Sequence, residues 1–97
     1  MDISKKTEDG TLTITVRGRL DTNTAPQLES ALPQDWTKAV VFDFGGLEYI
    51  SSAGLRVLIC AQKAAGAAGG RIKVANPNAM VKGVLDMTGC STLFDIV

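Results

Sequence analysis

The sequence predicts an α/β domain with a mixed central sheet, in which N-terminal antiparallel strands are followed by parallel ones, and with about three main helices. The first part of the chain alternates apolar and threonine residues around a turn signal, as a hairpin does. The remainder alternates apolar runs with segments of helical periodicity, which is typical of parallel strands joined by right-handed crossovers. Of the 97 residues, 45% are hydrophobic and 21% charged, so we expect one domain over residues 1–97.

The N-terminal hairpin is predicted from "EDGTLTITVRG", residues 8–18. An Asp-Gly pair is a hairpin turn signal, and the apolar residues after it alternate with threonines, as in a half-buried strand. A short partner strand is expected around residues 3–5.

The first helix is predicted in "DTNTAPQLESAL", residues 21–32. Thr24 is expected to cap it, with Gln27 completing a capping box and Pro26 tolerated in the first turn. Trp36, in the connection that follows, is expected to cover the core rather than bind a ligand. The residues expected to face inward are Leu28, Ala31 and Leu32.

A central strand is predicted in "AVVFDF", residues 39–44, whose consecutive apolar residues are typical of a strand covered on both faces. A helix is expected from about Ser52 to Ala65, with Arg56 and Lys63 on one narrow polar stripe and Cys60 on or beside it. Two interpretations stay open for this helix: it is buried under its neighbours, or it keeps an apolar face for a partner.

The last part of the chain contains the strand "RIKVAN", residues 71–76, a third helix and a final strand "LFDIV", residues 93–97. Asn76 is expected to cap the helix, with Pro77 at its first position and Gly89 at its end. Its core stripe, interpreted as packing rather than as a cofactor site, consists of Met80, Val81, Val84, Leu85 and Met87.

Composition excludes several classes of function. Ten basic residues balance ten acidic ones and are scattered, which argues against nucleic acid as a partner. No apolar run approaches the roughly 18 residues of a membrane span, so we expect a cytoplasmic protein without direct membrane contact. The chain has no histidine, and its two cysteines lack metal-site spacing. We therefore expect no enzyme activity, no metal and no cofactor.

Two segments are expected to share one surface, because in parallel sheets sites form beyond the carboxyl ends of the strands. Asp21 and Asn23 follow one strand, and residues 43–52 follow another. Ser51 and Ser52 stand at the predicted helix start, where a serine oxygen usually caps free backbone N–H groups. A phosphate would also be tolerated there, and its charge would disrupt a partner interface. A phosphoacceptor role for Asp43 lacks the acidic pair that would hold magnesium.

The chain resembles the STAS domain family, specifically the bacterial anti-sigma factor antagonists. The segments that carry the resemblance are "GRLDTNTAPQLE", "VVFDFGGLEYISSAGLRVL" and "NPNAMVKGVLDMTGCSTLFDI". The resemblance implies a module that binds an anti-sigma factor kinase of the GHKL type and so releases the sigma factor. It also implies that the kinase ends the interaction by phosphorylating a serine in the middle turn, and that a phosphatase of the PP2C type restores it.

The acceptor position departs from the family pattern Asp-Ser-Ser-Gly-Leu, whose second serine accepts the phosphate. Anchoring on Gly54 and Leu55 puts Ala53 at that position. Either the acceptor is Ser52, with Ser51 as the weaker alternative, or the domain is an unregulated antagonist. The expected partner surface consists of Asp21, Asn23, Ser51, Ser52, Ala53, Gly54, Leu55 and Arg56.

Two other functions stay open. Some stand-alone members of the family are regulatory subunits of membrane transport systems, such as ABC-type lipid transporters, and a purely structural scaffold is a third reading. No phosphate-binding loop supports nucleotide binding.

Overall fold

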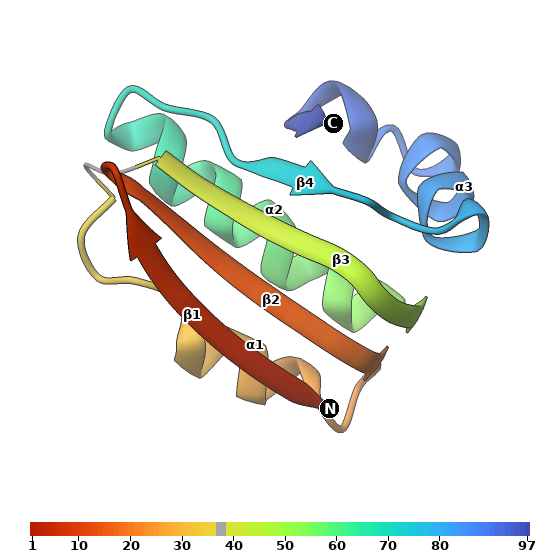
Figure 1. Ribbon diagram of the computed structural model, residues 1–97. Helices are drawn as coiled ribbons and strands as arrows, with labels where there is room; N and C mark the ends of the chain where they lie inside the picture. Colours follow the sequence, from red (N-terminus) through yellow and green to blue (C-terminus); the bar gives the residue numbers. More distant parts are fainter. Residues whose placement is uncertain (37–38) are drawn as a thin grey trace.

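The computed structural model describes residues 1–36 and 39–97 (Figure 1). Its strands form one sheet in the order β1-β2-β3-β4-β5, in which β1 is antiparallel to β2 and the other pairs are parallel. The predicted class and the predicted order of strands and helices are therefore confirmed. The elements are β1 (Asp2–Glu8), β2 (Thr11–Leu20), α1 (Ala25–Ala31), β3 (Ala39–Ile50), α2 (Ser52–Ala67), β4 (Lys73–Ala75), α3 (Ala79–Met87), the 3-10 helix η1 (Cys90–Thr92) and β5 (Asp95–Ile96).

The N-terminal hairpin turns at the predicted Asp-Gly pair. Asp9 and Gly10 have φ values of 51° and 77°, the left-handed backbone that a two-residue hairpin turn requires. The partner strand is longer than the predicted residues 3–5, because β1 pairs with β2 from Asp2 to Glu8. As an edge strand it carries exposed polar and charged side chains, so no apolar alternation marks its length.

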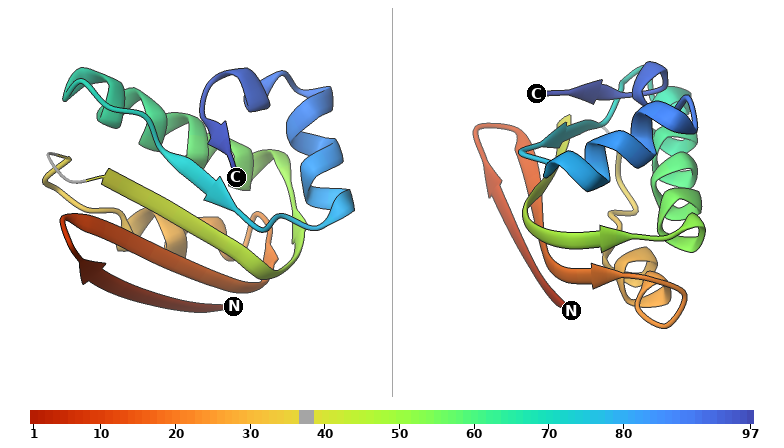
Figure 2. Two further views of the ribbon diagram at one scale, coloured as in Figure 1. Left: turned by 45° about the horizontal axis from the view of Figure 1, so that its top comes forward. Right: turned by 90° about the vertical axis from the view of Figure 1, so that its right-hand side faces the viewer.

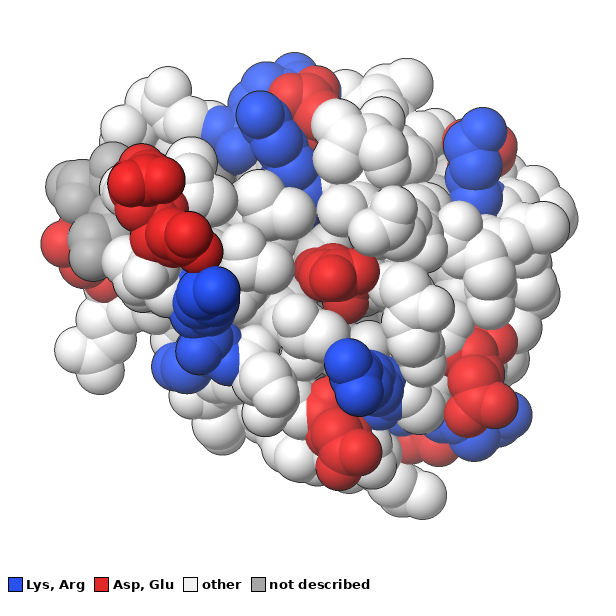
Figure 3. All heavy atoms as spheres, in the orientation of Figure 1, with Lys and Arg blue, Asp and Glu red and all other residues white. Residues whose placement is uncertain are grey.

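The sheet is covered by helices on one face, so the prediction that the central strand is covered on both faces is wrong. Val40, Phe42 and Phe44 are buried, whereas the alternate residues Val41 and Asp43 are only half-buried. Both α1 and α2 lie on the same side of the sheet (Figures 1 and 2). We call the opposite side the open face. Figure 3 views the open face and shows acidic and basic side chains interspersed over it.

Strand β3 continues through its two glycines and ends at Ile50, six residues beyond the predicted end at Phe44. A Cβ atom at Gly46 would lie 2.7 Å from Cγ of Arg17, so the glycine leaves room for that side chain to cross. Asp43 consequently lies inside the strand. Its Oδ1 accepts hydrogen bonds from the Gly45 N–H at 3.0 Å and from Nδ2 of Asn76 at 3.4 Å.

One apolar core fills the space between the sheet and the helices. Full burial of each large apolar side chain contributes about 1.5 to 3 kcal/mol. Leu28 of α1 is buried as predicted, Ala31 and Leu32 are half-buried, and Trp36 packs against the core as expected. The largest fully buried side chains are Phe42, Phe44, Phe94, Ile14, Leu20, Leu28, Leu47, Leu58, Ile72, Leu85, Val16 and Val74.

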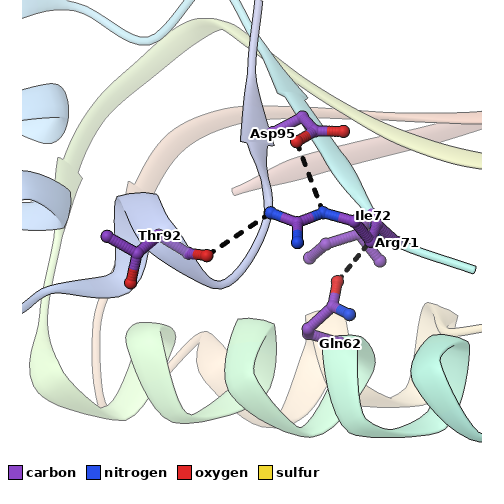
Figure 4. A network of polar contacts seen from close by, with 5 residues as sticks. All are labelled: Gln62, Arg71, Ile72, Thr92 and Asp95. Atoms are coloured by element: carbon purple, nitrogen blue, oxygen red, sulfur yellow. Dashed lines mark hydrogen bonds and ion pairs between the residues drawn. The ribbon is translucent and has the colours of Figure 1, made fainter.

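Polar contacts tie the segment just before β4 to α2, to η1 and to β5 (Figure 4). Oε1 of Gln62 accepts a hydrogen bond from the Ile72 N–H at 2.8 Å. Arg71 forms an ion pair of 3.3 Å with Asp95 and donates to the Thr92 carbonyl at 3.4 Å. The ion pair is half exposed and contributes little, but the Gln62 contact is partly buried and fixes the helix against β4.

The third helix begins later than predicted. Its N-cap is Asn78, whose Oδ1 accepts a hydrogen bond from the Val81 N–H at 2.8 Å. Asn76, the predicted cap, instead adopts a left-handed turn with a φ of 58°. The predicted final strand shortens to Asp95–Ile96, because the 3-10 helix precedes it.

The predicted core stripe of α3 is only partly correct. Val81 and Leu85 are buried and Val84 is half-buried, but Met80 is 45% exposed and Met87 is 89% exposed. The helix packs on one side only, against β3 and η1, so its opposite side stays in solvent.

We expect Asn78→Ala to lower the free energy of unfolding by about 1.5 to 2.5 kcal/mol, because it removes the cap of α3, worth about 1 kcal/mol, together with a second side-chain hydrogen bond. This second hydrogen bond runs from Nδ2 of Asn78 to the Leu47 carbonyl. Asn76→Gly should change stability by less than about 0.5 kcal/mol, since glycine readily adopts positive φ. Urea unfolding of both variants measures the difference, and an equal loss would contradict the assignment of the cap.

Candidate functional site

The ends of β2 and β3 meet at one edge of the sheet, as the predicted topology requires. Leu20 pairs with Ile50, and the Ser51 N–H donates to the Leu20 carbonyl at 2.9 Å. We call residues 51–54 the serine turn and residues 21–24 the Asp21 loop. The hydrogen bond between their flanking backbones places the two segments side by side.

The two serines of the turn have different environments. Ser51 is the N-cap of α2, and its Oγ accepts a hydrogen bond from the Gly54 N–H at 3.4 Å. Ser52 is the first residue of the helix and is exposed. Its hydroxyl forms no hydrogen bond with any residue that the structure describes. Ser51 thus caps the helix, whereas Ser52 is exposed and its hydroxyl is accessible.

The remaining residues of the expected partner surface differ in how far they are exposed. Gly54 is buried and Leu55 is 7% exposed, whereas Ala53 is half-buried and Asn23 and Arg56 are exposed. A Cβ atom at Gly54 would lie 2.7 Å from Cγ of Leu20 and 3.0 Å from Cγ1 of Ile50. Glycine therefore allows the start of α2 to rest directly on the ends of β2 and β3.

We expect Gly54→Ala to destabilise the fold by about 1 to 2 kcal/mol. Overpacking against Leu20 costs about 1 to 3 kcal/mol, which outweighs the gain of up to about 1 kcal/mol in helix propensity. Gly66→Ala is the matched control, because a Cβ atom there would meet only Nε2 of Gln62 at 3.7 Å. That control should be neutral or stabilising in thermal unfolding. Equal stability of the two variants would contradict the close approach.

The Asp21 loop is held by its own hydrogen bonds rather than by the predicted capping box. Oδ1 of Asp21 accepts from the N–H groups of Asn23 at 3.0 Å and Thr24 at 3.1 Å. The Thr24 hydroxyl donates to the Arg19 carbonyl at 2.8 Å and does not cap α1. Nε2 of Gln27 donates instead to the carbonyl of Met1 at 3.3 Å.

These contacts lower the pKa of the Asp21 carboxyl below its ordinary value. The main cause is the hydrogen bond from the Thr24 backbone, and a partial loss of hydration opposes it. The Thr24 hydroxyl, the Asn23 N–H and the positive charge of Arg19 add to the lowering. The guanidinium of Arg19 stacks 4.4 Å above the ring of Tyr49. A charged carboxylate is therefore the stable form of the loop.

We expect Asp21→Asn to destabilise the fold at neutral pH and to have no such effect in acid. A lowered folded-state pKa contributes stability that is present above the unfolded pKa, about 3.9, and disappears as the pH falls through the folded pKa. The gap in melting temperature between the wild type and the variant should thus be present at pH 7 and narrow as the pH falls below the unfolded pKa and through the lower folded pKa. A gap that stays constant throughout an acid titration would contradict the role of the charge.

The exposed side of α2 is polar. Ser52, Arg56, Cys60 and Lys63 form one exposed stripe, which confirms the predicted position of Cys60. Between these positions the helix residues are buried or half-buried, and none of its side chains is an exposed large apolar group. Of the two interpretations left open for this helix, burial under its neighbours is the one the structure supports.

A groove of about 250 Å³ separates α1 from α2 next to the serine turn. Its floor and rim combine small apolar groups with one acidic and one basic side chain. The lining residues are Thr22, Ala25, Pro26, Glu29, Ala53, Arg56, Val57 and Cys60. The groove therefore joins the Asp21 loop to the exposed stripe of α2 in one continuous surface.

Asp43 does not belong to this surface, because it lies within β3 on the open face. In the described part of the chain no three potential metal ligands gather. None of the described helices has the length and apolar character needed to cross a bilayer.

The five-stranded mixed sheet, the helices on one face and the capped turn at the start of α2 define a class of small α/β domains. The chain belongs to one family of this class, the STAS domain family, whose model matches residues 2–97. The resemblance recognised in the sequence is thereby confirmed.

Several similar proteins carry the name of anti-sigma factor antagonists. The protein BtrV of Bordetella bronchiseptica, whose name assigns it provisionally to the anti-sigma factor antagonists, is 33% identical over 91 residues, which cover 91% of this chain and 78% of BtrV. The crystal structure of an anti-sigma factor antagonist from Mycobacterium paratuberculosis is 26% identical, covers 98% of this chain and 83% of its own, and has a TM-score of 0.87. The Bacillus anti-sigma factor antagonist SpoIIAA shares the fold in its phosphorylated form, with 17% identity, a TM-score of 0.76 and coverage of 99% and 91% of the two chains.

Proposed function

We propose that this chain is an anti-sigma factor antagonist, a binding module that captures an anti-sigma factor and is released by phosphorylation of Ser52. The observation that carries the proposal is an exposed serine hydroxyl without a structural task, next to the Asp21 loop in a STAS domain. The relative BtrV carries the name of an antagonist, and SpoIIAA exists in a phosphorylated form. Both facts support the same function here.

Only some of the residues expected in the partner surface are accessible to another protein. Asp21, Asn23, Ser52 and Arg56 can touch another protein through their side chains. Ser51, Gly54 and Leu55 set the position of the turn instead. The partner that suits this surface is an anti-sigma factor that is also a serine kinase of the GHKL type.

Ser52 is the better acceptor of the two serines. Oγ of Ser51 accepts a helix-capping hydrogen bond, and a phosphate there would have to disturb the start of α2. Ala53, at the family's usual acceptor position, has no hydroxyl. A phosphate on Ser52 would add about −1.5 to −2 charges at a helix start that tolerates them. The fold would be kept and the interface would be lost through repulsion and desolvation.

Incubation with the cognate anti-sigma kinase and ATP should add one phosphate to the wild-type chain. The variant Ser52→Ala should accept none, whereas Ser51→Ala should still accept one, because it removes only a cap worth about 1 kcal/mol. Intact-protein mass spectrometry distinguishes these outcomes. A phosphate that persists in Ser52→Ala would reject the assignment of the acceptor.

Binding tests the rest of the proposal. Wild type and Ser52→Ala should bind the kinase equally, and Ser52→Asp should bind at least about tenfold more weakly, since a charge enters the interface. A wild type that binds the kinase without ever being phosphorylated would be an unregulated antagonist. Binding to an ATP-binding transport subunit, with none to the kinase, would instead support the transport function.

A further inference from the structure

Ser52 and Arg56 occupy neighbouring positions on the surface of α2. Residues separated by one helical turn have Cβ atoms about 5 to 6 Å apart, which is within reach of an arginine side chain. Both residues are exposed and lie on the polar stripe of the helix. Arg56 also lines the groove between α1 and α2, beside Ala53.

The guanidinium of Arg56 is not engaged by the described part of the chain. No ion pair or hydrogen bond to it occurs among residues 1–36 and 39–97. Glu29 lines the same groove from α1, yet the two side chains form no ion pair. Lys63, the other basic residue of the stripe, lies about 16 Å from Ser52 along the helix axis. Arg56 is therefore the basic group on this helix that can reach a phosphate on Ser52.

We propose that Arg56 is the intramolecular partner of the phosphate on Ser52 and holds it as a dianion against the first turns of α2. The inference rests on the proposed function, because it assigns a second residue to the same switch. An arginine fork can donate two parallel hydrogen bonds to phosphate oxygens, which makes the pair stronger than contact with a point charge.

The pairing would keep the phosphate on Ser52 in its doubly charged form. A phosphoserine loses its second proton with a pKa of about 6, so without help it is partly monoanionic in mildly acidic solution. A cation beside the phosphate favours the doubly charged form and lowers this second pKa. The repulsion that expels the partner would then change little with pH in that range.

The test uses the full chain with phosphoserine incorporated at position 52 during translation, so that no kinase is needed. The second pKa of the phosphate is measured by titration of its ³¹P chemical shift in the wild-type background and in Arg56→Gln. We expect the pKa to be higher in Arg56→Gln by about 0.2 to 0.7 unit. Arg56→Lys should recover part of the difference, because it keeps the charge and loses the fork.

Lys63→Gln is the matched control, since it removes the same charge from the same stripe beyond the reach of Ser52. Its phosphate should titrate as in the wild type. Equal pKa values in the wild type and Arg56→Gln would overturn the inference, and so would an equal shift in Arg56→Gln and Lys63→Gln, which would show a general charge effect. Failure of the kinase to phosphorylate Ser52 would leave this titration intact and would count only against the proposed function.

Discussion

The contact between the start of α2 and the ends of β2 and β3 is the constraint on which the candidate site depends. Gly54 allows the helix to rest on Leu20 and Ile50, and the Ser51 N–H joins the helix start to the Leu20 carbonyl. With these contacts in place, the Asp21 loop and the serine turn cannot lie anywhere but next to each other. The surface is thus a consequence of backbone packing rather than of attraction between its polar side chains.

Much of this arrangement could be predicted from the sequence. The Asp-Gly pair fixed the hairpin, since few other residues adopt the required backbone so readily. The alternation of strand-like and helical segments was enough to predict that the later strands are parallel. The position of Cys60 followed from the helical period once Arg56 and Lys63 were placed on one stripe.

The errors concern alternatives between which the local sequence pattern does not decide, and only the first of them depends on segments far apart in the chain. Consecutive apolar residues in β3 suggested cover on both faces, but no local signal says that α1 and α2 lie on the same side of the sheet. Thr24 matches a capping box, yet its hydroxyl is drawn to the Arg19 carbonyl at the end of β2. Two asparagines flank Pro77, and the left-handed turn at Asn76 leaves the capping role to Asn78.

The different roles of the two serines, one a helix cap and the other an exposed hydroxyl, affect which substitutions the fold tolerates. Ser51 stabilises the helix start, whereas the exposed Ser52 side chain forms no hydrogen bond with the residues that the structure describes. A lineage could therefore lose or regain the hydroxyl at position 52 by single base changes at almost no cost to folding. Under the proposed function, such changes would switch regulation on or off while leaving the architecture untouched.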